Sequence, residues 1–194
     1  EAMKIITSKT MLLKNLIDDL EQLSKLETHE FTFDFMTYTI TDIADYLIDA
    51  NHADIEASGF KLELIYDRTI LQNYWIIADQ NRINQVFSNI ITNAIKYSAE
   101  YKKILIRFDL DTSKDYFEIS VRDYGIGIPP EKLPHIFDRF FRDNSNPDAI
   151  KGRGLGLTIC KEIVRAHGGI ITAESNTNFI GSKFTFTIPL YKEF

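Results

Sequence analysis

Four polar side chains recur on one side of a predicted helix over residues 81–98. Gln85, Asn89, Asn93 and Lys96 follow one another at steps of four, four and three residues, so a helix places them in a single row. An asparagine carbonyl oxygen can ligate Mg²⁺ without adding charge, and a lysine offers a point charge for a phosphate. An ordinary wet face of an amphipathic helix has the same pattern, so this segment alone leaves both interpretations open.

Glycines mark two further places where the backbone could approach a ligand. In VRDYGIGIP (121–129), a predicted strand ends at Asp123 and is followed by two glycines. A carboxylate there can accept from the exocyclic amine of a base such as adenine. In KGRGLGLTICKEI (151–163), three alternating glycines lead into a helix whose first amides and dipole favour an anion. A tight turn and a loose hinge are the alternatives, because neither pattern is specific by itself.

The segment between the glycine clusters combines arginines with aromatic residues. IFDRFFR (136–142) sets Arg139 and Arg142 beside three phenylalanines. Aromatic side chains can hold a loop on the body of a domain while arginines reach a phosphate, although a short amphipathic surface helix is the alternative. Four of the five prolines lie between the two clusters. We therefore predict a long loop over residues 125–153 with one short helix near 134–141.

The remaining periodicity predicts the elements that position these segments. An apolar stripe over residues 3–27 predicts a helix that needs a partner. The helix over 154–167 is expected to turn Leu155, Ile159, Ile163 and Ala166 inward. A helix is expected at 41–57, and Asp79 is expected to cap the helix that runs to about 98. Strands are expected at 28–38, 60–66, 75–78, 103–110, 116–124, 169–175 and 183–190. The order predicts an α+β fold: a mixed, mostly antiparallel sheet with helices on one face, preceded by a projecting helix.

Composition narrows the class of protein. The 194 residues are 44% hydrophobic and 26% charged, with a net charge of −6. These values support one sizeable core and argue against a nucleic-acid binder, which would need an excess of Lys and Arg. Cys160 is the single cysteine, which excludes an internal disulfide and suggests a reducing compartment. No apolar run approaches the roughly 18 residues of a membrane span, so we expect a soluble, cytoplasmic chain.

Taken together and in this order, NIITNAIKYS, DYGIGIP, IFDRFFR and GRGLGLTICKEIV resemble the N, G1, F and G2 boxes of sensor histidine kinases. Those enzymes share an ATP-binding superfamily with Hsp90-type chaperones, type II topoisomerases and MutL-type repair proteins. The resemblance covers about residues 30–190 and implies a two-layer α/β sandwich of the GHKL (Bergerat) type. It further implies that residues 1–28, ending in LSKLE, are the second helix of a dimerisation and phosphoacceptor hairpin. Residues 29–194 would be the catalytic ATP-binding domain, with an ATP lid at about 129–153.

The resemblance also implies roles for individual residues. Asn93 would ligate Mg²⁺, with Asn89 as a candidate second ligand, and Asp123 would accept from the adenine amine. Asn89 stands where ATP-hydrolysing relatives carry a glutamate, and an amide is a poor base, which favours transfer to a protein over hydrolysis. Catalytic roles would fall to Asn89, Lys96 and Arg142. The implied ATP-binding residues are Asn89, Asn93, Lys96, Tyr97, Asp123, Gly125, Gly127, Ile128, Arg139, Arg142, Arg153, Gly154, Leu155, Gly156 and Leu157.

Two departures from the family pattern stand out. The lid-end motif has Lys151 and Arg153 around Gly152, where the family usually carries a glycine and a small hydroxyl residue. The phosphoacceptor box is absent, because none of the four histidines has its flanking residues, and His29-Glu30 is followed by Phe-Thr-Phe. We therefore predict no phosphoacceptor in this chain and interpret it as an excised catalytic fragment. His135 and His167 are expected to have surface or capping roles, and His52 lies in the helix predicted at 41–57.

The resemblance favours one function and leaves two alternatives. In the favoured one, the chain transfers the γ-phosphate of Mg-ATP to a histidine on a missing first hairpin helix, for onward transfer to a response-regulator aspartate. Its expected partners are its own hairpin domain, a second copy in a homodimeric full-length protein and a cognate response regulator. The parent protein would be membrane-anchored with this part in the cytoplasm. The alternatives are a non-catalytic nucleotide-binding interaction module and a GHKL-type ATPase. Asn89 in place of glutamate and the short phenylalanine-rich lid argue against the ATPase.

Overall fold

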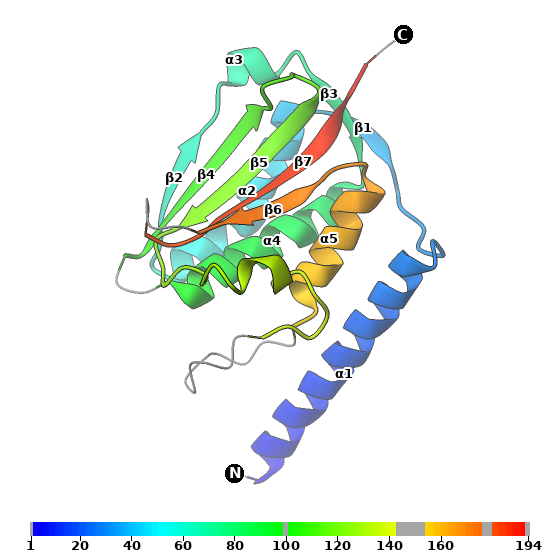
Figure 1. Ribbon diagram of the computed structural model, residues 1–194, viewed down its shortest axis with the longest axis vertical. Helices are drawn as coiled ribbons and strands as arrows, with labels where there is room; N and C mark the ends of the chain where they lie inside the picture. The colour runs from blue at the N-terminus through cyan, green and yellow to red at the C-terminus, as the bar shows by residue number, and fades with distance from the viewer. Residues whose placement is uncertain (1, 99–100, 143–153, 176–179, 193–194) are drawn as a thin grey trace.

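A computed structural model describes residues 2–98, 101–142, 154–175 and 180–192 of the chain. A sheet lies against helices that cover one of its faces, and a long helix projects from this body (Figure 1). The helices are α1 (Ala2–Glu27), α2 (Ile40–Ala57), α3 (Arg68–Leu71), α4 (Gln80–Tyr97) and α5 (Gly156–Ala166). The strands are β1 (Met36–Thr39), β2 (Lys61–Ile65), β3 (Trp75–Ala78), β4 (Lys103–Leu110), β5 (Tyr116–Asp123), β6 (Ile171–Glu174) and β7 (Lys183–Tyr191).

The sheet is mixed and mostly antiparallel, as the sequence predicted. Its strand order is β1-β3-β7-β5-β4-β2, and β6 also pairs with β7. Only β2 and β4 run parallel among these pairs. Strand β7 pairs with β5 along one edge, while its other edge meets β6 near Lys183–Phe186 and β3 near Leu190–Tyr191. The predicted α+β, two-layer architecture is confirmed.

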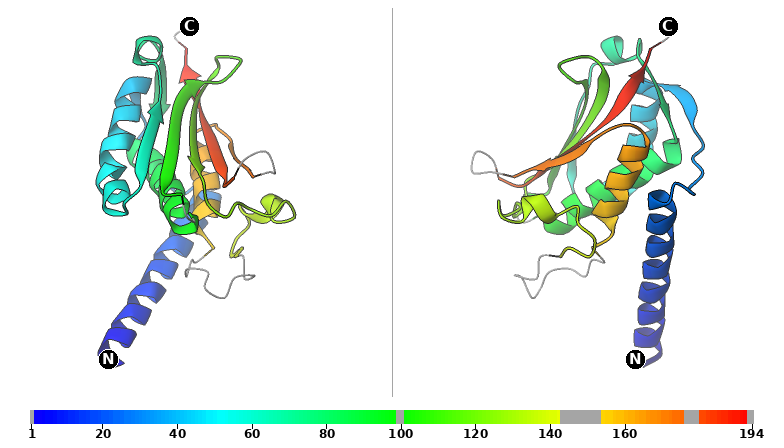
Figure 2. Two further views of the ribbon diagram at one scale, coloured as in Figure 1. Left: turned by 90° about the vertical axis from the view of Figure 1, so that its left-hand side faces the viewer. Right: turned by 45° about the vertical axis from the view of Figure 1, so that its right-hand side comes forward.

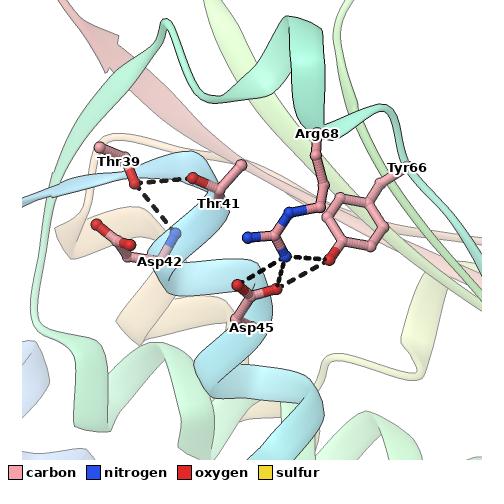
Figure 3. Close-up of polar contacts among 6 residues, drawn as sticks. All are labelled: Thr39, Thr41, Asp42, Asp45, Tyr66 and Arg68. Carbon is pink, nitrogen blue, oxygen red and sulfur yellow. Dashed lines mark hydrogen bonds and ion pairs between the residues drawn. The ribbon is translucent and has the colours of Figure 1, made fainter.

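The core lies between the sheet and helices α2, α4 and α5. On α4, the apolar positions Ile83, Phe87 and Ile90 are fully buried, which leaves the polar row on the opposite side. The side chain of Asp79 caps this helix by accepting a hydrogen bond from the backbone N–H of Arg82 at 3.1 Å. Thr39 caps α2 in the same way through the N–H of Asp42 at 3.1 Å (Figure 3). Local capping therefore sets where both helices begin.

A polar cluster ties α2 to the segment between β2 and α3. The Asp45 carboxylate accepts hydrogen bonds from Tyr66 at 2.8 Å and from Arg68 at 2.5 Å, and Arg68 also donates to the Tyr66 hydroxyl at 2.8 Å (Figure 3). Burial would raise the pKa of Asp45, but the hydrogen bonds from Arg68 and Tyr66 outweigh it, and the pKa is lowered. The cluster satisfies its own charges, and we assign it a structural role.

Among the side chains of helix α1 that the structure describes, the buried ones lie at its C-terminal end. Leu23 and Leu26 are buried, whereas Ile6, Leu13 and Ile17 are 60%, 62% and 61% exposed. Figure 2 shows the N-terminal part of α1 extending away from the other elements. The apolar stripe along this part is therefore uncovered, as expected for a helix that needs a partner. None of the described helices combines the length and apolar character needed to cross a bilayer.

The buried histidine His167 holds the C-terminal end of α5 in place. His167 donates from Nδ1 to the carbonyl oxygen of Ile163 at 2.8 Å and accepts at Nε2 from the backbone N–H of Asp79 at 3.0 Å. Burial lowers the pKa of His167, so the ring is neutral in the folded protein. The rings of Phe33 and Phe35 pack on it edge-on, with centroids at 5.4 and 5.0 Å. Of the two roles expected for His167, the structure supports the capping role and excludes the surface one.

Several local expectations were wrong. The strand predicted at 28–38 is limited to β1, because the aromatic residues before it pack their rings against His167 and against Arg82, whose guanidinium lies 4.6 Å from the ring of Phe31. The helix predicted near 134–141 is a single 3₁₀ turn at Leu133–His135. Ala166 is exposed rather than inward, and the short helix α3 was not predicted. Residues 143–153, which include the predicted lid end with Lys151 and Arg153, lie outside the described residues.

Candidate nucleotide-binding site

The predicted chemical segments converge on one cavity of about 590 Å³. It lies between α4, the segment that follows β5 and the beginning of α5. Most of the residues predicted for ATP binding line it: Asn89, Asn93, Lys96, Tyr97, Asp123, Gly127, Ile128, Arg142, Gly154, Gly156 and Leu157. Three predicted residues do not, namely Gly125, Arg139 and Leu155, and Arg153 lies outside the described residues. Three segments distant in sequence therefore form one site.

Helix α4 supplies the polar wall of the cavity. Asn89, Asn93 and Lys96 all line it, as their spacing predicted. The ammonium of Lys96 lies 4.7 Å from the centre of the Tyr97 ring, which also lines the cavity. Gln85, the first member of the row, also lines the cavity, but its amide and that of Gln22 on α1 donate to each other at 2.9 Å. The side chains of the row that remain available to a ligand are therefore Asn89, Asn93 and Lys96.

Asp123 lies at the end of β5 and is buried, with 4% of its surface exposed. One carboxylate oxygen accepts from the backbone N–H of Gly125 at 2.8 Å and from that of Ser182 at 3.1 Å. Burial raises the pKa of Asp123 despite these two donors. In the ranges that the structure describes, no cationic side chain forms an ion pair with it. A buried carboxylate that is held by hydrogen bonds from Gly125 and Ser182 is suited to accept a further hydrogen bond from a ligand.

The two glycines after Asp123 act differently. A side chain at Gly125 would place Cβ 2.2 Å from the carbonyl oxygen of Tyr97, so this glycine lets the loop cross the end of α4 rather than line the cavity. Gly127 lines the cavity and has a φ of +73°. The next residue, Ile128, donates its N–H to the hydroxyl of Ser175 at 2.8 Å.

The beginning of α5 forms the opposite wall. Leu155, the N-cap, has no side-chain capping hydrogen bond and is itself fully buried. Gly154 has a φ of +73°, and its carbonyl oxygen accepts from the N–H of Phe140 at 2.8 Å. A side chain at Gly156 would lie 2.6 Å from the amide nitrogen of Asn89. The uncapped first turn of α5 therefore borders the cavity at close range to α4, which suits an anionic ligand.

The two arginines of the 136–142 segment point to different places. Arg142 lines the cavity, as predicted. Arg139 instead forms an ion pair with Glu27 at the end of α1 and does not line the cavity. Phe137 anchors the segment, since its carbonyl oxygen accepts from Thr158 at 3.1 Å and its ring meets that of Phe184 edge-on at 6.5 Å. The expected anchoring by aromatic residues is found at this position.

Sequence reasoning missed three kinds of contributor. Ser182 and Ser175 join the site from the β6–β7 region because strand pairing brings them beside the end of β5. Cys160 lines the cavity and touches Asn89, although the sequence had drawn attention to it only as a single cysteine. Asp19 of α1 lies at the cavity as well. None of the four histidines lines it.

The likeness of this chain to known proteins agrees with this geometry. Residues 78–192 match the family described as histidine kinase-, DNA gyrase B-, and HSP90-like ATPase. Sensor histidine kinase WalK of Bacillus subtilis (strain 168) is 36% identical over 190 residues, which are 97% of this chain and 30% of the relative. The phytochrome-like protein Cph1 of Synechocystis is 35% identical over 180 residues, 92% of this chain and 22% of the relative. The chain thus spans less than a third of either relative.

Solved structures give the same fold. The catalytic domain of histidine kinase ThkA superposes with a TM-score of 0.62 at 30% identity, covering 81% of this chain and 96% of that domain. Full-length ShkA, solved in complex with AMPPNP, has a TM-score of 0.72 at 22% identity, covering 93% of this chain and 36% of that one. The chain belongs to the histidine kinase-, DNA gyrase B- and HSP90-like ATPase family. Within that family, its fold and relatives are those of the catalytic ATP-binding domain of sensor histidine kinases.

Proposed function

We propose that this chain holds Mg-ATP in the cavity and transfers its γ-phosphate to a histidine on a hairpin helix outside the chain, from which it passes to a response-regulator aspartate. The observation that carries the proposal is the convergence of Asn93, Asp123 and the uncapped start of α5 on one cavity. A Mg-nucleotide requires an acceptor for the amine of its base, a neutral oxygen for its cation and backbone amides for its phosphates.

The residues at the cavity fit a cation that is held largely by the phosphates. In the described part of the chain, no group of three or more His, Cys, Asp or Glu side chains could form a metal cage. Asn93, with Asn89 as second candidate, would hold Mg²⁺ through neutral oxygens, as suits a cation already carried by phosphates. The bound cation would neutralise charge on the transferring phosphoryl group.

The chain's own groups would position and stabilise the nucleotide. Asp123 would orient the base, Tyr97 and Ile128 would border it, and Lys96 and Arg142 would face the phosphates as cations. Such placement supplies much of the rate of a phosphoryl transfer, in which the protein does little covalent chemistry. Asn89 in place of a carboxylate disfavours activation of water, which supports transfer to a protein rather than hydrolysis.

Two partners follow from the proposal. Residues 1–28 would be the second helix of a hairpin and residues 29–194 the catalytic domain, with a lid over about 129–153. The uncovered stripe at Ile6, Leu13 and Ile17 would pack against the first hairpin helix and against a second copy in a homodimeric parent protein. A cognate response regulator would receive the phosphoryl group. We place the domain on the cytoplasmic side of a membrane-anchored parent, which fits its use of ATP and its single buried thiol.

The decisive test is transfer from labelled ATP to a complete two-helix hairpin domain of the parent protein. We expect label on the hairpin that is acid-labile and base-stable, as phosphohistidine is. Steady hydrolysis of ATP without any partner would instead indicate a GHKL-type ATPase. Tight nucleotide binding with neither transfer nor hydrolysis would indicate a non-catalytic nucleotide-binding module.

The chain alone is expected not to autophosphorylate. His29 follows α1 with a φ of +57°, and His52 is exposed on α2. His135 ends the 3₁₀ turn, with Nδ1 2.9 Å from an Asp138 carboxylate oxygen, and His167 is buried against Asp79. Because proximity to the γ-phosphate is required, none of these positions suits an acceptor. The measurement is incubation of the chain alone with labelled ATP and Mg²⁺. Stoichiometric acid-labile label on it would contradict the expectation, and mapping that label to His29 would identify the acceptor that we exclude.

A further inference from the structure

The side chain of Asn89 is held by two consecutive turns of α5. Its amide nitrogen, Nδ2, donates a hydrogen bond to the sulfur of Cys160 at 3.1 Å. One turn earlier on α5, the position that a Cβ on Gly156 would occupy is 2.6 Å from Nδ2 and 2.9 Å from Oδ1 of the same amide. The amide group therefore lies flat against the glycine and points its nitrogen at the sulfur.

The thiol of Cys160 distinguishes the two ends of that amide. Cys160 is 1% exposed, and a thiol buried in apolar surroundings keeps its hydrogen. The hydrogen can be directed toward the carbonyl oxygen of Val86, which lies 3.9 Å from the sulfur. The sulfur then offers lone pairs to Asn89. A flipped amide would take the thiol hydrogen for Oδ1 and so remove it from the carbonyl oxygen of Val86. The observed orientation makes both hydrogen bonds and is therefore the favourable one.

The orientation matters because a cation can bind one end of an asparagine amide and not the other. Oδ1 can ligate a cation or accept from its bound water, whereas Nδ2 carries two hydrogens and no available lone pair. With Nδ2 engaged by sulfur, Asn89 has Oδ1 left for a ligand in the cavity that it lines.

We propose that Cys160 is a positioning residue of the nucleotide site, which fixes the amide of Asn89 so that its oxygen serves the cation of Mg-ATP. The proposal rests on the proposed function. Cys160 need not touch nucleotide or metal, since it acts through Asn89. The same contact explains why a buried cysteine lies at this cavity when the chain uses it for no disulfide.

The test compares ATP affinity with Mg²⁺ and with a chelator, by calorimetry, in variants of the whole chain. Cys160→Ala should weaken Mg-ATP binding roughly two- to tenfold, the effect of losing one hydrogen bond, and leave metal-free ATP binding unchanged. Cys160→Ser should recover most of the loss, because a hydroxyl can also accept from Asn89. Val164→Ala, a truncation at a fully buried position one turn later on α5, is the matched control and should leave the ratio of the two affinities unchanged.

A double variant shows whether the effect passes through Asn89. In an Asn89→Ala background, Cys160→Ala should have no further effect on the ratio of affinities, since the group to be positioned is gone. If Cys160→Ala unfolds the chain, Cys160→Val takes its place, because it fills the site without accepting a hydrogen bond.

The outcomes separate this inference from the proposed function. If the parent chain binds ATP and Asn89→Ala lowers the affinity ratio while Cys160→Ala does not, the positioning role is wrong and the proposed function stands. If Asn89→Ala also leaves the ratio unchanged, Asn89 does not serve the cation and the inference is overturned. If the parent chain binds no ATP under either condition, the proposed function itself fails.

Discussion

Helices α4 and α5 run side by side, and their polar groups are satisfied in opposite ways at the two ends of the pair. At one end, the N–H of Asp79 donates to His167, and the Asp79 carboxylate and His167 Nδ1 have further partners within the protein. At the other end, Asn93 and Lys96 border a cavity beside a helix start without a side-chain cap. We infer that the end with Asp79 and His167 contributes stability, whereas the end with Asn93 and Lys96 contributes binding.

Two aspartates show the same contrast. Asp45 is paired with Arg68 and Tyr66, and these partners lower its pKa (Figure 3). Asp123 is buried against backbone amides, and burial raises its pKa. The neighbours of Asp45 stabilise its charged form, as is typical of a structural carboxylate. For Asp123, part of the desolvation cost is not compensated within the protein, as we expect for a carboxylate that binds a ligand.

The largest effect is expected at the stabilising end. His167→Ala should lower the free energy of unfolding by about 2–4 kcal/mol, because it leaves the buried N–H of Asp79 without an acceptor and removes a packed ring. Denaturant unfolding measures this change. His52→Ala, at an exposed position of α2, is the control and should change stability by about 0.5 kcal/mol or less. A similar loss in both variants would contradict the special role of the buried histidine.

The same residue predicts a pH dependence. The ordinary histidine pKa is 6.5, and burial lowers it in the folded state. Below pH 6.5 the unfolded chain therefore takes up a proton that the folded chain does not, so stability falls as the pH falls. The contribution of neutral His167 is fully present above that pH. Unfolding measured at pH 7.5 and at pH 5.5 should show a smaller difference in His167→Ala than in the parent chain.

The next effect is expected at the binding end. Asp123→Asn should weaken ATP binding by about 1–3 kcal/mol, because it removes a charged acceptor from the base. It should leave stability nearly unchanged, since burial already disfavours the charged form of Asp123. Calorimetry with ATP and denaturant unfolding separate the two quantities, and unchanged ATP affinity would reject the adenine assignment. Asp45→Asn is the matched control, because it alters the paired carboxylate outside the cavity and should leave ATP affinity as it is.

A smaller, more selective effect is expected from Asn93→Ala. This variant should lose about tenfold in affinity for Mg-ATP, since even changes behind a metal ligand can have effects of that size. Binding of metal-free ATP should stay close to that of the parent chain, because the amide oxygen is assigned to the cation. ATP titrations in the presence of Mg²⁺ and in the presence of a chelator measure the two affinities. An equal loss under the two conditions would mean that Asn93 contacts the nucleotide directly.

The parts that sequence predicted best depend on local pattern. The row on α4 was found because helical spacing alone brings Asn89, Asn93 and Lys96 to one side, and Asp79 was found as a cap because capping is local. Ser182 and Cys160 were missed because strand pairing and helix packing bring them to the site. Phe31, Phe33 and Phe35 suggested a longer strand, whereas their rings serve tertiary packing. The ion pair of Arg139 with Glu27 was not predicted, because the two residues lie far apart in the sequence.

The smallest effect is expected from Arg139, and it sharpens the comparison of the two arginines in this segment. Arg139 is paired with Glu27 on α1, while Arg142 lines the cavity. Arg139→Ala should therefore change ATP affinity less than about twofold, and should loosen the end of α1 by about 1 kcal/mol or less, the range for an exposed ion pair. Arg142→Ala should weaken ATP binding, because it removes a cation from the phosphate side. Calorimetry measures the affinities, and hydrogen exchange of the amides near Glu27 measures the loosening. Arg165→Ala, which breaks an exposed pair with Glu162 on α5, is the control for losing an arginine. Equal losses of ATP affinity in Arg139→Ala and Arg142→Ala would show that Arg139 leaves Glu27 and turns to the nucleotide when ATP binds.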